Sequence, residues 1–221
     1  MELHHVLNRG VDKRKIFLDS QDYARFIHDT YEFNDTAPAQ SYERRLPNVG
    51  PTRSYIRERL VDIHGWVLMK NHYHLLLSEL IDGGITRFLM KLNVGYAKYF
   101  NERYERSGTL FQGRTKKVLI KHEAHFLYIL HYVHLNPLDY LTGAAEWRER
   151  DKNSIENTVE ALKYLNGYRW SSYLDYCGKK NFSSVLTKDL FENVFGNYQK
   201  EIENYLKDAE TPMITDPSVF E

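Results

Sequence analysis

Two apolar stretches with a short polar connection between them constrain the fold more than any other feature. Residues 59–69 and 72–79 are rich in β-branched and aromatic side chains, and Lys70–Asn71 lies between them. Stretches of this composition are typical of strands, and a short polar connection pairs them as neighbours. The chain therefore contains an antiparallel pair of strands, around which the other elements have to pack.

The other elements follow from the spacing of apolar residues. We expect a strand over 3–9, helices over 21–34 and 85–105, a strand near 116–120 and a helix over 122–134. Ser20 is the expected N-cap of the first helix, and Asn136–Pro137 ends the last, because proline cannot continue a helix. This order predicts an α+β fold, a ferredoxin-like sandwich with a mainly antiparallel sheet and helices on one face.

The chain divides into a main domain over 1–145 and a helical C-terminal extension over 146–221. Residues 35–58 contain three prolines and Gly50, which predicts an irregular excursion within the main domain. Residues 182–221 form an acidic tail, with eight acidic residues against three lysines.

The net charge is zero, but its distribution is uneven. Residues 83–125 carry nine basic and three acidic residues. A basic middle and an acidic tail favour a local site for a polyanion, although a solvated helix face would have the same composition.

Several classes of protein are not expected. No apolar run is long enough to cross a bilayer, and the first residues lack the apolar stretch of a signal peptide. The single cysteine, Cys177, excludes an internal disulfide. We therefore expect a cytoplasmic protein.

A His-x-His pattern marks the second strand of the predicted hairpin. Alternate side chains of a strand share a face, so His72 and His74 lie on one face and Tyr73 on the other. Two adjacent imidazoles can bind one divalent cation. They could also be two polar residues on the exposed side of a half-buried strand.

A second pattern lies at the end of the helix over 122–134. Tyr132 and Asn136 are four residues apart and share a helix face, so a phenol and an amide oxygen could meet one metal ion. A phenol with a pKa near 10 attacks a phosphodiester only with assistance, such as charge neutralisation by a metal. Alternatively, Tyr132 is a buried helix-end residue and Asn136 a cap. Tyr128, one turn earlier, is the rival nucleophile.

Five segments in this order resemble the REP-associated tyrosine transposases, which belong to the single-tyrosine HUH endonucleases and are related to insertion-sequence transposases. They are HHVLNRGVDKRKIF, MKNHYHLLLSE, GTLFQGRTK, YILHYVHLNP and YRWSSY, and together they span roughly residues 3–180. The chain departs from the family at Lys70, where proline is usual. The excursion and the acidic tail are poorly covered by the resemblance.

The resemblance implies a chemistry for the main domain. His72, His74 and Asn136 would be the ligands of Mg²⁺ or Mn²⁺, and Tyr132 the nucleophile. The family cleaves and rejoins single-stranded DNA beside a hairpin through a 5′-phosphotyrosine intermediate, in DNA transposition or repeat mobilisation. A hairpin-binding protein that no longer cuts, and a metal-dependent nuclease using water, are the alternatives.

The expected partner is single-stranded DNA with a hairpin, bound near the nucleoid, with no membrane and no small-molecule substrate. A monomer is favoured and a homodimer is possible. The expected DNA contacts are Asn8, Arg9, Lys70, Arg114, Lys116 and Lys117.

Overall fold

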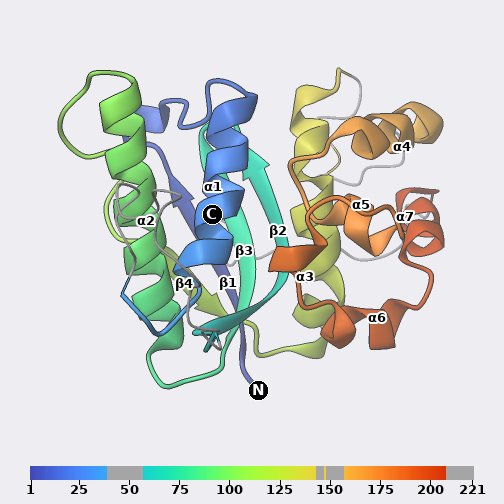
Figure 1. Cartoon of the computed structure of the whole chain (residues 1–221). Coiled ribbons are helices and arrows are strands. Elements are labelled where there is room, and N and C mark those ends of the chain that lie inside the picture. Colours follow the sequence, from blue (N-terminus) through green and yellow to red (C-terminus); the bar gives the residue numbers. More distant parts are fainter. Residues whose placement is uncertain (39–56, 143–146, 148–156, 208–221) are drawn as a thin grey trace, which may run out of the picture.

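The computed structural model describes residues 1–38, 57–142, 147 and 157–207 (Figure 1). The strands are β1 (Leu3–Arg9), β2 (Val61–Met69), β3 (His72–Glu79) and β4 (Lys116–Leu119). The α-helices are α1 (Ser20–Phe33), α2 (Gly84–Arg103), α3 (Glu123–Leu135), α4 (Thr158–Gly167), α5 (Tyr173–Tyr176), α6 (Asp189–Phe195) and α7 (Tyr198–Lys207). Short 3₁₀ helices are η1 (Val11–Lys13), η3 (Asn136–Tyr140) and η4 (Ser183–Val185).

Within these residues the strands form one antiparallel sheet in the order β2-β3-β1-β4. The β2–β3 hairpin turns at Lys70–Asn71, as predicted, and pairs Met69 with His72. A βαββαβ chain with β1 and β3 in the middle of the sheet is the ferredoxin-like arrangement. The predicted fold class is therefore confirmed.

Helices α1 and α2 cover one face of the sheet (Figure 1). Their apolar side chains pack on alternate strand residues, including Val6, Tyr73 and Leu75. The two helices approach closely at Gly95, where an added methyl group would meet the Phe33 ring at 2.3 Å. The sequence predicted the helices on one face; α1 and α2 lie there, whereas α3 lies on the other.

Helix α3 lies against the opposite face of the sheet, and α4, α6 and α7 lie beyond α3 (Figure 1). This second core joins Val67 and Leu76 of the sheet to side chains of α3 to α7. Gly65 lets α3 approach, because a Cβ there would lie 2.9 Å from Leu130 Cδ1. The sheet is thus buried on both faces. For that reason the strands carry apolar residues on both faces rather than on one.

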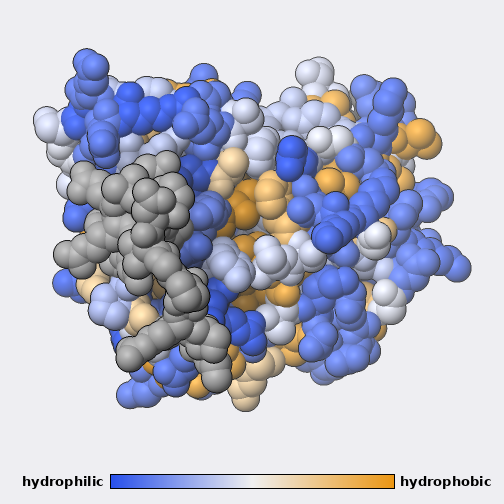
Figure 2. Space-filling model, in the orientation of Figure 1, coloured by the Kyte–Doolittle hydropathy of each residue, from blue (hydrophilic) through white to orange (hydrophobic). Residues whose placement is uncertain are grey.

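The free edge of β2 is covered by the chain that precedes α5. Trp170 O accepts from Leu68 N at 2.9 Å, and Ser172 N donates to Trp66 O at 2.9 Å. An unpaired strand edge is a template for unwanted pairing, so this cover protects the sheet. Figure 2 shows hydrophobic residues between the α1 layer and the C-terminal helices, with hydrophilic residues around them.

The prediction of the N-cap was wrong by one residue. Asp19 caps α1, with its carboxylate accepting from Gln21 N and Asp22 N, and Ser20 is the first helical residue. Asp19 also pairs with Arg103 at the end of α2 at 2.5 Å, a second contact that local sequence does not reveal.

Parts of the predicted excursion and extension lie outside the described residues, namely 39–56, 143–146, 148–156 and 208–221. At the ends of the excursion, Thr36 N donates to Glu58 O at 2.8 Å. In the part of the extension that the structure describes, the helices are α4, α5, α6 and α7. None of the described helices is long and apolar enough to span a bilayer.

Candidate metal and nucleophile site

His72 and His74 lie on the sheet face that α3 covers. The register pairs His74 with Leu7 and Val67, and His72 with Arg9 and Met69, so all of these side chains share that face. The two imidazole ring centroids are 5.0 Å apart, with the planes at 83°. The predicted shared face is observed, and the rings are close enough to meet one ion.

Asn71 orients His72. Its Oδ1 lies 2.6 Å from His72 Nδ1, and its Nδ2 donates to Lys13 O at 3.3 Å. The bond to Lys13 fixes which end of the amide faces His72, so His72 Nδ1 has to carry the proton. His72 Nε2 then has a lone pair, which is the tautomer that a metal ligand needs.

His5 makes the corresponding contact with His74. His5 Nε2 lies 2.8 Å from His74 Nδ1, and the two rings stack with centroids 5.1 Å apart. His5 is fully buried on β1. His5 lies in the strand expected over 3–9, but which residue it faces depends on the register between β1 and β3.

Tyr132 of α3 packs directly on this pair. Its ring centroid is 5.6 Å from that of His74 and 5.9 Å from that of His5, with both pairs edge to face. Tyr128, the rival, lies one turn away, with its ring 6.1 Å from those of Tyr132 and Tyr205. The geometry places Tyr132 against the histidines and directs Tyr128 toward α7.

Asn136 follows Tyr132 by one turn and is fully buried. Its Nδ2 donates to Tyr132 O at 2.7 Å, so the amide does cap the helix end. The cap uses the amide nitrogen, whereas a metal would use Oδ1. The two interpretations of Asn136 are therefore compatible.

The site is closed in this structure. Tyr132 is 5% exposed and His74 2% exposed. The Trp147 ring lies 5.8 Å from that of Tyr132, and its Nε1 donates to Asp139 Oδ1 at 2.8 Å. A phosphodiester could reach the phenol only after the packing around Tyr132 opens.

The expected DNA contacts fall into different environments. Arg9 is half-buried beside His72, and its Nε makes no hydrogen bond within the described part of the chain. Lys70 is exposed at the hairpin turn, with Nζ 4.6 Å from the Tyr140 ring centroid. Both cations therefore border the site.

The remaining expected contacts are more distant in the fold or are engaged. Asn8 is buried, and its amide donates to Thr115 Oγ1 at 3.0 Å. Arg114, Lys116 and Lys117 are exposed before and on β4. Lys116 pairs with Leu7 on the His74 face, whereas Lys117 pairs with Val6 on the opposite face.

The donor set differs from a carboxylate or thiolate site. Among the described residues there is no group of three His, Cys, Asp or Glu side chains that could hold a metal ion. The candidate set of two imidazoles and one amide is of another kind. Asn71 engages Nδ1 of His72, which leaves Nε2 as the ligand atom, and His5 contacts Nδ1 of His74.

The other α3 histidines serve packing. His134 bonds Tyr198 OH through Nδ1 at 2.9 Å and Ser172 Oγ through Nε2 at 2.7 Å, and burial holds its pKa well below the usual value. His131 Nε2 lies 3.5 Å from a carboxylate oxygen of Glu201. Both contacts join α3 to the C-terminal helices.

Comparisons with known proteins give a similarity in structure and none in sequence. No family model matches the chain, and no curated protein matches it in sequence. It is similar to a solved structure of a REP-associated tyrosine transposase bound to a REP hairpin, with a TM-score of 0.46 and 12% sequence identity. The similarity covers 86% of this chain and 87% of that one.

Proposed function

We propose that the protein is a metal-dependent endonuclease and strand transferase for single-stranded DNA, with Tyr132 as the nucleophile. The observation that supports it is the packing of the Tyr132 ring on His74 and His5, with His72 5.0 Å from His74. The phenol ring and the imidazoles of His5, His72 and His74 are neighbours in the fold, and Asn136 follows Tyr132 by one helical turn.

His72 and His74 would hold a divalent cation through Nε2, and Asn136 would hold it through Oδ1. Mg²⁺ or Mn²⁺ bound there supplies charge neutralisation for a phosphodiester. Arg9, half-buried beside His72, would bind a non-bridging phosphate oxygen. Lys70 at the hairpin turn would bind a neighbouring phosphate.

The reaction is a transesterification. Tyr132 Oη attacks phosphorus, its proton passes to solvent, and the bond from phosphorus to the 3′ oxygen breaks. The 3′ oxygen takes up a proton and leaves as a hydroxyl, and the 5′ phosphate stays on the tyrosine. Because the ester bond is conserved, a second 3′ hydroxyl can attack it and rejoin the strands without ATP. DNA hairpins, the ligand of the similar solved structure, are the proposed recognition element.

A second candidate is a hairpin-binding protein that does not cut. The burial of Tyr132 under Trp147 favours it, because the phenol is closed to a phosphodiester in this structure. The first proposal requires this packing to open when DNA binds.

Tyr132→Phe tests the proposal, because it removes only the hydroxyl. The wild-type protein, with Mn²⁺ and a hairpin oligonucleotide labelled on the 3′ side of the cut, should form a covalent adduct that survives a denaturing gel. Tyr132→Phe should bind the hairpin and form no adduct, and EDTA should abolish the adduct in the wild type.

Tyr128→Phe is the matched control and should keep the adduct. Peptide mass spectrometry should locate the DNA on Tyr132. Binding without any adduct in the wild type would favour the non-cutting protein. Cleavage by Tyr132→Phe at the wild-type rate would favour attack by water.

A further inference from the structure

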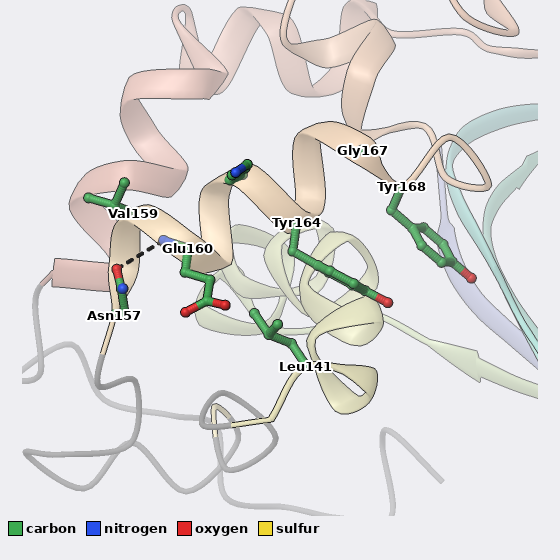
Figure 3. Close-up of a pocket in the computed structure, with 8 residues that line it drawn as sticks. Leu141, Asn157, Val159, Glu160, Tyr164, Gly167 and Tyr168 are labelled. Atoms are coloured by element: carbon green, nitrogen blue, oxygen red, sulfur yellow. Dashed lines mark hydrogen bonds between the residues drawn. The ribbon is translucent and has the colours of Figure 1, made fainter.

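A groove of about 780 Å³ lies between α4 and the segment that follows η3 (Figure 3). Its lining residues are Leu141, Asn157, Val159, Glu160, Lys163, Tyr164, Gly167 and Tyr168. Figure 3 shows Tyr164 and Tyr168 projecting to the same side at the end of α4, with Leu141 near Tyr164. Their ring centroids are 6.3 Å apart, and the planes differ by 26°. The groove therefore has a wall of two nearly parallel aromatic rings.

The groove is joined to the hairpin that carries the candidate ligands. Tyr168 OH donates to Leu68 O at 2.6 Å, near the end of β2. Tyr140, next to Leu141, accepts a hydrogen bond from Lys70 N at 2.8 Å, and Lys70 immediately precedes Asn71 and His72. A chain lying in the groove could therefore continue past Lys70 to His72.

The chemistry of the lining suits unpaired nucleotides. Lys163 is an exposed cation on the groove, and Lys70 is an exposed cation toward the site, while Glu160 is the one acidic residue of the lining. Burial raises the pKa of both Tyr164 and Tyr168, so the phenols stay neutral and do not repel phosphates. Aromatic rings bordered by lysines bind single strands by stacking bases and pairing phosphates.

We propose that this groove binds the unpaired nucleotides beside the scissile phosphate, with a base stacked on Tyr164 and the backbone passing Lys163 and Lys70. The proposal rests on the proposed function, since it names where that site holds its substrate. Duplex DNA does not fit, because its bases are stacked on one another and not available to the rings.

Binding of two hairpins tests the groove, one with a single-stranded tail and one blunt. The variants are made in Tyr132→Phe, so that no cleavage occurs, and the readout is fluorescence anisotropy. Tyr164→Ala should weaken binding of the tailed hairpin roughly fivefold or more and leave the blunt hairpin unchanged. Tyr164→Phe, which keeps the ring, should bind both as the parent does.

Tyr31→Ala is a matched control, because Tyr31 is a 39% exposed tyrosine on α1, away from the groove. A 5-iodouracil in the tail should photocrosslink to Tyr164. The proposed role of the groove would be overturned if Tyr164→Ala bound the tailed hairpin as tightly as its parent. It would also be overturned if the variant lost the same affinity for both hairpins. Neither result affects the test for a covalent adduct on Tyr132. Failure of the groove proposal can therefore be distinguished from failure of the proposed function.

Discussion

Asn71 and His5 each engage the Nδ1 atom of one candidate ligand. For Asn71 the proton position follows from the bond to Lys13. For the His5–His74 contact the proton position is not fixed in this way, because either imidazole can be the donor. His74 can ligate through Nε2 only if its own Nδ1 donates, and His5 Nε2 then has to be the acceptor. His5 would thus act as a positioning residue.

Replacing His5 tests this role. His5→Leu removes the acceptor and should weaken Mn²⁺ binding about 10- to 100-fold, the usual effect of losing such a partner. His5→Gln offers a carbonyl oxygen in a similar position and should bind Mn²⁺ more tightly than His5→Leu does. The measurement is a Mn²⁺ titration followed by electron paramagnetic resonance. Wild-type affinity in His5→Leu would show that His74 needs no such partner.

At the scale of elements, the WSSY segment closes the edge of β2 and also ties α3 to the sheet. Ser172 Oγ accepts from Trp66 N at 2.9 Å and lies 2.7 Å from His134 Nε2. One buried hydroxyl therefore joins β2, α3 and the start of α5. Because α3 carries Tyr132, the same contacts help to hold the phenol against the histidines.

Ser172→Ala should destabilise the protein by about 1–3 kcal/mol, since it leaves buried polar groups of Trp66 and His134 without this partner. The measurement is the free energy of unfolding from urea titration. Ser184→Ala, at an exposed position in η4, should change it by no more than about 0.5 kcal/mol. A similar loss in both variants would mean that the Ser172 network does not stabilise the fold.

For the whole molecule, buried histidines couple stability to pH. Burial lowers the pKa of His134 and of His64 from the ordinary value of 6.5. The folded protein keeps them neutral to a lower pH than the unfolded chain does, and the unfolded chain takes up protons as the pH falls through 6.5. The unfolded state then binds more protons, so the free energy of unfolding decreases as the pH falls.

When the pH is lowered from 7.5 to 5.5, we expect the free energy of unfolding to fall by about 1.4 kcal/mol for each histidine that stays neutral in the folded protein. His134→Gln cannot titrate and should show a smaller pH dependence than the wild type. The measurement is the free energy of unfolding from urea titration at the two pH values, for the wild type and the variant. An unchanged pH dependence in the variant would exclude His134 as a source.

Residue patterns alone predicted the elements of the main domain, and the resemblance added the candidate chemistry. The hairpin at Lys70–Asn71 and the helices came from local periodicity, which depends on neighbours in the chain. The shared face of His72 and His74 came from strand alternation, and the spacing of Tyr132 and Asn136 from the helix repeat. These properties act over a few residues, so a sequence is sufficient for them.

Only the tertiary structure decided which elements face one another. The register of β1 on β3 placed His5 against His74, and packing of α3 on the sheet placed Tyr132, rather than Tyr128, on that pair. The burial of Asn8, the choice of Asp19 as N-cap and the groove beside α4 arose in the same way. Such contacts join residues many positions apart, and their energies depend on packing that no local pattern encodes.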